Sequence, residues 1–238
     1  MAENIPKRNY PFTDADLCML TSNLCNSLSR NESDFAIFGI NSTKISELKA
    51  LGDAFEVFPT DFVLVGDIMA ATENKNSLRQ QVLETIRNMA LRVEIKWSAN
   101  SPKYKRLELN NPSQQTDNQL LVTARAIHSK VSEYLADLAV YGLTQNLLDD
   151  FENLNGQYEQ ALNFQADAVT MRDEKKLQRI AKGNEIYRLV SAYCNFGKRI
   201  YEKNNSAKYH EFLIFKDYGR KKKKTEKNEI EGGTMEEG

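Results

Sequence analysis

Three short sequence patterns each occur twice in this chain, in the same order. They are Thr13-Asp14-x-x-Leu17 and Thr116-Asp117-x-x-Leu120, Asp34-Phe-Ala-Ile-Phe-Gly39-Ile and Asp137-Leu-Ala-Val-Tyr-Gly142-Leu, and Ser101-Pro-Lys-Tyr104 and Ser206-Ala-Lys-Tyr209. The first two pairs are 103 residues apart and the third pair is 105 residues apart. Repetition at a nearly constant spacing predicts a tandem duplication of about 100 residues. A duplicated chain favours two equivalent surfaces over a single asymmetric active site.

The hydrophobic residues of both copies recur at spacings of three and four, which is typical of amphipathic helices. The first stripe consists of Leu17, Leu20, Leu24 and Leu28, and the second of Leu120, Ala124, Ile127, Val131, Leu135 and Leu138. Thr13 and Thr116 precede these stripes and are predicted N-caps. Gly39 and Gly142 follow them and are predicted to end the helices in the left-handed conformation. New caps at 41–43 and Thr144 then predict helical hairpins.

The boundary between the second and third helices is less clear in the sequence. In the second copy, helices over 116–141, 144–172 and 175–203 would have similar lengths and suit an up-down-up bundle. Residues 171–176 contain no glycine or proline, so a continuous helix from 144 to 203 is the alternative. In the first copy the turn is predicted at 73–77, and Pro59 predicts a kink or a restart.

We therefore predict an all-α fold, a tandem duplication of an antiparallel three-helix bundle. A short extended segment, 105–109 or 210–215, is expected after each repeat. The predicted organisation is a flexible arm at 1–12, helical repeat 1 at 13–109, a linker at 110–115, helical repeat 2 at 116–215 and a charged disordered tail at 216–238.

Composition places the chain among ordinary soluble globular proteins. Of its 238 residues, 41% are hydrophobic and 27% are charged, and its formal net charge of -1 argues against a body that binds nucleic acid by charge. Cys18, Cys25 and Cys194 form no disulfide framework, which predicts reduced core thiols in a cytoplasmic protein. The longest apolar run, 62–65, is too short for a transmembrane segment.

The sequence lacks the common catalytic and cofactor-binding motifs. Its two histidines, His128 and His210, lie outside the Glu-x-x-His and His-x-x-x-His patterns of metal sites. No Gly-x-x-x-x-Gly-Lys-Ser/Thr or Gly-x-Gly-x-x-Gly phosphate loop occurs, and no Gly-x-Ser-x-Gly nucleophile elbow. We therefore predict no catalytic residue, no cofactor and no metal site.

Two duplicated features are candidates for interaction with a partner. Lys103-Tyr104 and Lys208-Tyr209 place an aromatic side chain beside a cation in each copy. Exposed, they would serve recognition; we favour the alternative, in which the tyrosines pack over the bundle ends. Asp34 and Asp137 are equivalent carboxylates, for which we favour surface ion pairs over a symmetric ligand contact.

The end of the sequence carries opposite charges in succession. The basic run consists of Arg220, Lys221, Lys222, Lys223 and Lys224. It could contact a phosphate backbone or an anionic lipid surface. The segment 228–238 that follows is acidic, so this run is a second candidate for interaction.

Four segments resemble a group of uncharacterised all-helical bacterial proteins. They are Leu138-Ala-Val-Tyr-Gly-Leu-Thr144, Gly183-Asn-Glu-Ile-Tyr187, Cys194-Asn-Phe-Gly-Lys198 and Ala207-Lys-Tyr-His-Glu-Phe212. The resemblance covers residues 13–215 and implies two related helical halves, with no established activity. Some similar proteins continue into a β-sandwich-like module, in whose place this chain has the charged tail.

Three functional hypotheses follow from these features. The first is a non-enzymatic structural or interaction protein that binds a protein partner or associates with itself. The second is a nucleic-acid or anionic-surface binding module that uses the basic tail. The third is an enzyme or small-ligand binder with a pocket between the bundles.

Overall fold

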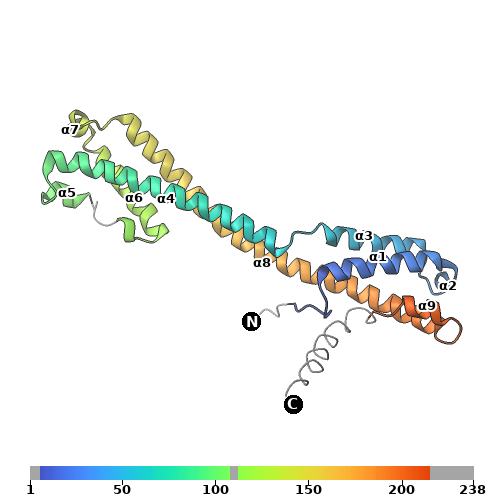
Figure 1. Cartoon of the computed structure of the whole chain (residues 1–238). Coiled ribbons are helices and arrows are strands. Elements are labelled where there is room, and N and C mark those ends of the chain that lie inside the picture. Colours follow the sequence, from blue (N-terminus) through green and yellow to red (C-terminus); the bar gives the residue numbers. More distant parts are fainter. Residues whose placement is uncertain (1–5, 108–111, 215–238) are drawn as a thin grey trace, which may run out of the picture. The chain divides into compact units, whose positions relative to one another are not determined.

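The computed structural model describes residues 6–107 and 112–214, and all regular secondary structure in these ranges is helical (Figure 1). The helices in chain order are α1 Asp14–Arg30, α2 Glu32–Ala36, α3 Ser42–Glu56, α4 Asp61–Trp97, α5 Pro102–Arg106, η1 Pro112–Gln114, α6 Asp117–Ser132, α7 Leu135–Leu138, η2 Ala139–Tyr141, α8 Gln145–Tyr201 and α9 Ser206–Glu211. The all-α prediction is therefore confirmed.

The chain forms two compact units, and neither coincides with one predicted repeat. Unit 1 comprises Met1–Pro59 and Glu174–Gly238, and unit 2 comprises Thr60–Asp173. Unit 1 contains α1, α2, α3, the C-terminal part of α8, and α9. Unit 2 contains α4 to α7 and the N-terminal part of α8. Each unit thus combines the first hairpin of one predicted repeat with the third helix of the other.

The predicted turns between second and third helices are wrong in both copies. Residues 73–77 lie inside α4, and residues 171–176 lie inside α8, so the continuous alternative holds for the second copy. The first copy is interrupted instead at 57–60, where Pro59 precedes the new helix. Proline lacks the amide hydrogen that helix continuation requires, and in the second copy the corresponding Leu162 leaves the helix uninterrupted. Gly156 likewise lies within α8 and does not end a helix.

The predicted extended segments are also wrong within the described residues. Residues 102–106 form α5 and residues 206–211 form α9. The physical reason lies in the preceding residue, because each helix has a polar N-cap that satisfies a first-turn amide. The Ser101 side chain accepts a hydrogen bond from Tyr104 N, and the Asn205 side chain accepts one from Lys208 N. Local capping outweighs the alternating hydrophobic pattern.

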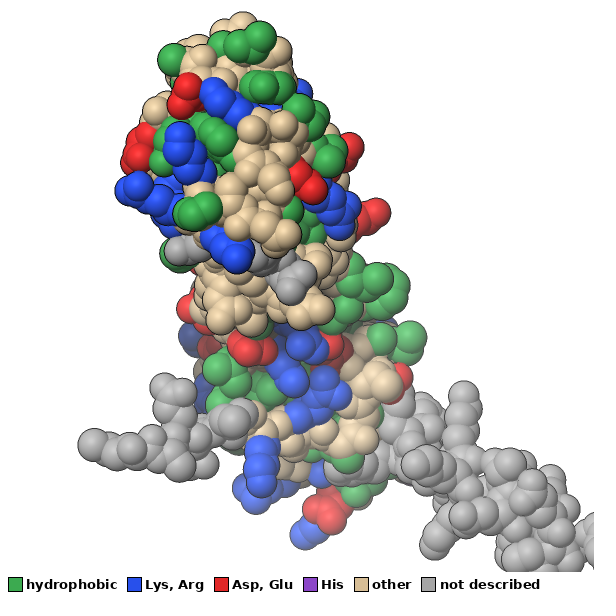
Figure 2. Space-filling model, turned by 90° about the vertical axis from the view of Figure 1, so that its left-hand side faces the viewer, with side chains coloured by type: hydrophobic (Ala, Val, Ile, Leu, Met, Phe, Trp, Pro, Cys, Tyr) green, Lys and Arg blue, Asp and Glu red, His purple; other side chains and the backbone are tan. Residues whose placement is uncertain are grey.

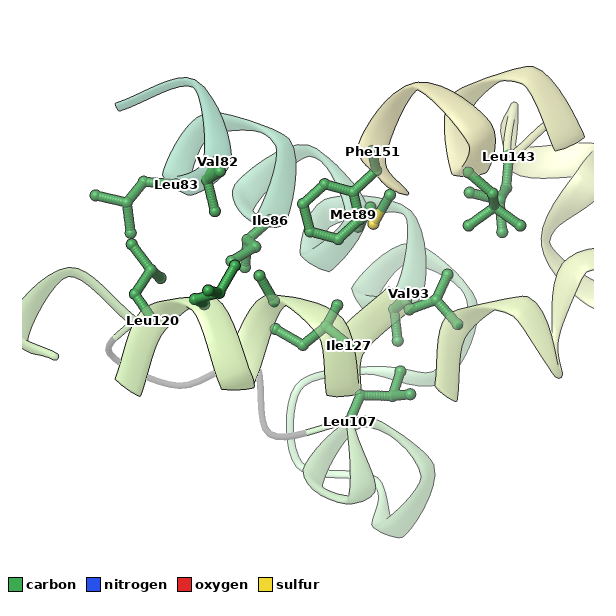
Figure 3. Packing of buried hydrophobic residues seen from close by; sticks show 14 of the residues in the cluster. Val82, Leu83, Ile86, Met89, Val93, Leu107, Leu120, Ile127, Leu143 and Phe151 are labelled. Atoms are coloured by element: carbon green, nitrogen blue, oxygen red, sulfur yellow. The ribbon is translucent and has the colours of Figure 1, made fainter. Parts of the chain in front are cut away.

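The core of unit 2 is a hydrophobic cluster between α4, α6 and the start of α8 (Figure 3). Val82, Ile86, Met89 and Val93 recur on one face of α4 and are at most 3% exposed. They face a stripe on α6, and Phe151 on α8 closes the cluster (Figure 3). The buried α6 residues are Leu120, Leu121, Ala124, Ile127 and Val131, the stripe that the sequence predicts.

The core of unit 1 is likewise formed by a helical hairpin and part of a long helix. The buried stripe of α1 and the buried face of α3 pack with Ile186, Val190 and Cys194 of α8. Phe212, after α9, is fully buried and lies 5.3 Å from Phe35 between ring centroids. The predicted role of the cysteines as small core residues holds for Cys25 and Cys194, which are buried thiols, whereas Cys18 is partly exposed.

Both hairpins begin at the predicted caps and turn at the predicted glycines, but the single helix predicted over 116–141 is divided into α6, α7 and η2. Thr13 and Thr116 form capping boxes. In each, the threonine side chain accepts a hydrogen bond from the backbone amide of the third helical residue, Asp16 or Gln119, and the side chain of that residue accepts one from the threonine amide. Gly39 and Gly142 have φ angles of 78° and 79°. Side chains with a Cβ rarely adopt this region, so glycine allows the sharp reversal between the helices.

Residues 7–12 lie against α8, whereas the sequence predicts a flexible arm there. Tyr10 is 4% exposed, and its ring occupies the space in which Gly183 would carry a Cβ. The Asn184 side chain accepts from Asn9 N at 2.7 Å and donates to the Lys7 carbonyl at 2.8 Å. The absence of a side chain at Gly183 thus admits an aromatic ring onto the helix.

Gly197 provides a test of the α8 packing in unit 1. A Cβ at this position would overlap the ring of Phe212, so we expect Gly197→Ala to lower the free energy of unfolding by about 1–3 kcal/mol. Gly156→Ala is the matched control in the same helix. Nothing lies within 4 Å of its added Cβ, and it should stabilise by about 0.5–1 kcal/mol. Urea unfolding followed by circular dichroism measures both; equal stabilities would contradict this packing.

Candidate interaction surfaces

Each unit exposes a pair of hydrophobic side chains at the turn of its hairpin. In unit 1 the pair is Ile37 and Phe38, with exposed fractions of 79% and 52%. In unit 2 the pair is Val140 and Tyr141, with fractions of 89% and 39%. We call these pairs tip 1 and tip 2. They occupy the same positions of the duplicated motif, directly before the left-handed glycine.

The backbone of each turn aims the pair away from the core. At tip 1 the amide of Ile40 donates to the Phe35 carbonyl at 3.3 Å, and at tip 2 Leu143 donates to Leu138 at 3.2 Å. These four flanking side chains are all buried, at 5% exposure or less. Burial on both sides of the glycine therefore anchors the turn and leaves Ile37 and Val140 largely in solvent, whereas the Phe38 ring lies 6.2 Å from that of Phe196 on α8 and Tyr141 is 39% exposed.

An anchored carboxylate precedes tip 1. Asp34 accepts a hydrogen bond from the Tyr201 hydroxyl at 2.7 Å, and Lys208 Nζ lies 3.5 Å from the same oxygen. The hydrogen bond from Tyr201 and the charge of Lys208 hold the pKa of Asp34 below its usual value. Lys208 Nζ also lies 4.9 Å from the ring centroid of Tyr201, a cation–π contact.

Tip 2 has a corresponding carboxylate with a different set of partners. Lys96 Nζ lies 2.9 Å from an Asp137 carboxylate oxygen and donates to the Asp137 carbonyl at 2.5 Å. The hydrogen bond from Lys96 and its charge lower the pKa of Asp137. Lys103 Nζ lies 4.9 Å from the Trp97 ring centroid and 5.9 Å from that of Tyr134. The ion pairs favoured for Asp34 and Asp137 are therefore present in both units.

The predicted interaction residues divide between these clusters and the surface. Lys103 and Lys208 contact aromatic rings beside the tip carboxylates, as described above. Tyr104 is 9% exposed in the core of unit 2, and Tyr209 is half-buried against that of unit 1. The tail residues Arg220, Lys221, Lys222, Lys223 and Lys224 lie outside the described residues.

A second pair of carboxylates, Asp14 and Asp117 of the repeated Thr-Asp pattern, joins the helices of each unit. Asp117 lies 2.7 Å from Lys75 Nζ and 2.8 Å from Arg79 Nη1, and it accepts from the Tyr158 hydroxyl at 2.8 Å. Burial raises the pKa of Asp117, but the hydrogen bonds from Lys75 and Tyr158 and the two cations outweigh it and lower the pKa. Burial and the bond to Asp117 raise the pKa of Tyr158 to about 12.

Asp14 is the corresponding residue in unit 1. It accepts from Arg179 Nε at 2.6 Å and from the Tyr10 hydroxyl at 2.7 Å, and Arg8 Nη2 lies 2.8 Å away. Arg179 also donates to the Phe58 carbonyl at 2.6 Å. The only sequence signal for these two networks is the repeated Thr-Asp pair, which is explained equally well by capping.

Most other exposed hydrophobic residues do not share this repetition, although Met19 on α1 and Val122 on α6, 59% and 67% exposed, are also 103 residues apart. In unit 2, α4 and α8 carry Phe62, Val63, Met69, Phe164, Val169 and Met171 on their surfaces. At the 103-residue spacing, Phe62 corresponds to Gln165 and Met69 to Arg172. Hydrophobic, basic and acidic side chains are interspersed on the face shown in Figure 2. The tips are therefore the exposed aliphatic–aromatic pairs that occupy equivalent positions in both units.

The cavity between α1 and α3 offers little space for a small substrate. Its volume is about 90 Å³, and it is lined by Cys18, Thr21, Lys49 and Asp53 among others. Ligand pockets usually exceed about 300 Å³. Burial raises the pKa of Cys194 to about 12, which opposes thiolate formation. Among residues 6–107 and 112–214, no three His, Cys, Asp or Glu side chains form a group that could hold a metal ion.

Comparison of this chain with protein-family models, curated proteins and solved structures finds no significant match. None of the helices in the described ranges combines the length and the apolarity needed to cross a lipid bilayer.

The network around Asp117 predicts a pH dependence of stability. Because its folded pKa lies below the unfolded value of 3.8, its contribution is full above that value and is lost as the pH falls through the folded pKa. We expect Asp117→Asn to lower the free energy of unfolding at pH 7 by roughly 2 kcal/mol, since Lys75 and Arg79 lose their counterion. The difference from wild type should shrink below about pH 4.

Asp53→Asn is the matched control for this experiment. Asp53 forms an exposed pair with Lys49 at 3.1 Å, and both side chains are 64% exposed. Its loss should change stability by less than about 0.5 kcal/mol. Chemical unfolding of the three proteins at pH 7 and pH 3 gives the comparison. An Asp117→Asn effect that is constant with pH would contradict the ion-pair network.

Proposed function

We propose that this chain is a tandem duplication that acts as a non-enzymatic interaction or assembly protein, with tip 1 and tip 2 as two equivalent binding surfaces. The observation that carries the proposal is the repetition of an exposed aliphatic–aromatic pair at the same turn position in both units. An exposed hydrophobic side chain alone is common on protein surfaces. Two such pairs, each held by the same backbone device, indicate a repeated role.

The surroundings of the tips support binding over a purely structural turn. A turn requires the left-handed glycine and the buried residues beside it, but it does not require exposed Ile37, Phe38 or Val140. Polar residues at these positions would serve the turn equally well and would reduce exposed apolar area. Aromatic and aliphatic side chains on a rigid support are the usual anchors of protein–protein interfaces. The expected partner is therefore a protein surface with a small apolar depression.

Self-association is the first form of this proposal to test. Light scattering coupled to size exclusion, at low and high salt, gives the mass of the wild-type chain over a range of concentrations. Replacement of Ile37 and Phe38 by serine, together with replacement of Val140 and Tyr141, should reduce any oligomer to a monomer. Replacement of one pair alone should leave a smaller assembly, because one tip remains.

Val57→Ser is the matched control, since Val57 is 82% exposed and lies outside both tips. It should leave the mass unchanged. A wild-type chain that is monomeric throughout would move the test to a partner captured on the immobilised chain. That partner should bind the Val57→Ser protein and not the double-tip variant. Equal binding by both would reject the tips as the binding surfaces.

A further inference from the structure

The two halves of the chain contact each other reciprocally, and we infer that the chain is a covalently joined form of a symmetric dimer. Half one is 13–109 and half two is 116–214. Two surfaces are concerned, one in each unit, where the hairpin of one half packs against the third helix of the other half. The partner that these surfaces fit is a second copy of the same half. This inference rests on the proposed duplication and is independent of the tips.

The hydrophobic cores show the reciprocity most directly. In unit 1, the hairpin of half one supplies Leu17, Leu48 and Phe55, and half two supplies Ile186 and Val190. In unit 2 the roles are exchanged. Half one supplies its third helix, α4, and half two supplies its hairpin, whose fully buried residues include Leu120, Leu148 and Phe151. Within the described residues, neither half encloses a core of its own.

The ion pairs at the start of each hairpin show the same reciprocal pairing between the two halves. Asp14 of half one meets Arg179 of half two, and Asp117 of half two meets Lys75 and Arg79 of half one. Lys75 and Arg179 are 104 residues apart, between the spacings of 103 and 105 that separate the repeated motifs. The carboxylate of each half is thus neutralised by the third helix of the other half.

The clusters beside the tips make the same exchange. Asp34 of half one binds Tyr201 and Lys208 of half two, and Asp137 of half two binds Lys96 of half one. In each unit a lysine after the third helix covers an aromatic ring, as Lys103 covers Trp97 and Lys208 covers Tyr201. Contacts in which residue i of one copy meets j of the other, and j meets i, define an isologous dimer interface.

Each half therefore carries both sides of the interface. The third helix of half one offers Lys75 and Lys96, which match the charges of its own Asp14 and Asp34. A second copy of half one could accept these pairs in place of half two. The short sequence between the halves, 110–115, raises the local concentration of the two partners and favours the pairing of unlike halves within one molecule.

The test separates the halves without removing any residue from the full chain. A recognition site for a specific protease is inserted between Asn110 and Asn111, and the purified protein is cut. We expect the cut protein to keep the mass of the uncut protein in light scattering, because each unit needs both halves. Its melting temperature should rise with protein concentration more steeply than that of the uncut protein. Two separate folded species, or a constant melting temperature, would overturn the inference.

Native mass spectrometry after unfolding and refolding of the cut protein tests the self-complementarity. Pairs of identical halves should appear beside pairs of unlike halves, and their complete absence would reject the symmetric-dimer origin. In the cut protein, Asp14→Arg or Arg179→Asp alone should weaken the association of the halves by about tenfold or more. The two changes together should restore most of it, and Asp53→Arg should have no effect. Failure of restoration would contradict the reciprocal pairing.

These outcomes are distinct from failure of the proposed function. The tip variants report on association between whole molecules, whereas the cut protein reports on association between halves. Cut halves that stay together while the tip variants bind normally would reject the tips and retain the inference. The reverse result would reject the inference and leave the tips as binding surfaces.

Discussion

The structure depends on the burial of each hairpin's apolar face by a helix from the other half of the chain. A two-helix hairpin buries only part of an amphipathic stripe, and small helical units gain stability when a further helix covers the remainder. Here the cover for α1 and α3 is the C-terminal part of α8, and the cover for α6 and the start of α8 is α4. The pairing of the halves is therefore a condition of having a core at all.

Electrostatics reinforces this arrangement at particular points and does not create it. Asp14 and Asp117 lie in the first turns of their helices, where a carboxylate is already favourable beside the helix dipole. Each also receives a cation from the covering helix, Arg179 or the pair Lys75 and Arg79. Because the carboxylates are partly buried, salt screens these pairs less than it screens exposed pairs.

Local structure was largely predictable from the sequence, and long-range pairing was not. The capping threonines and the left-handed Gly39 and Gly142 follow from side-chain chemistry within four residues, and they are confirmed. The pairing of hairpin and third helix is not encoded in periodicity, because equivalent stripes in two copies are interchangeable. The sequence therefore could not distinguish a repeat that folds on itself from one that folds on the other repeat.

The candidate interaction surfaces were likewise predictable only in part. The repeated Lys-Tyr pattern marks Lys103 and Lys208, which lie over aromatic rings beside the tip carboxylates, but no repeated motif marks Lys96 or Tyr201. The exposure of Ile37, Phe38, Val140 and Tyr141 could not be predicted from the motif, because a hydrophobic residue in a helical pattern is expected to be buried. Their exposure depends on where the helix breaks before the glycine.

The interiors of the two hairpins differ in a compensating way. In unit 1, Gly52 packs against Thr21, whose Cγ2 would lie 3.1 Å from an added Cβ. The corresponding residues in unit 2 are Asn155 and Ala124, both buried, so the larger side chain has moved from the first helix to the second. Close packing tolerates such an exchange only when volume is conserved within the pair. Compensation fits descent of both hairpins from one packed unit, in which the helix interface was retained while its residues changed.

The tips have changed differently from this interior pair. Ile37 with Phe38 and Val140 with Tyr141 share the order of an aliphatic and an aromatic residue, although the two aliphatic residues are 79% and 89% exposed and Phe38 contacts the ring of the partly exposed Phe196. Solvent-exposed positions that only solubilise the turn would be expected to drift toward polar residues. The same chemical order at both tips, with the aliphatic residue of each pair exposed to solvent, is the strongest reason to look for function there.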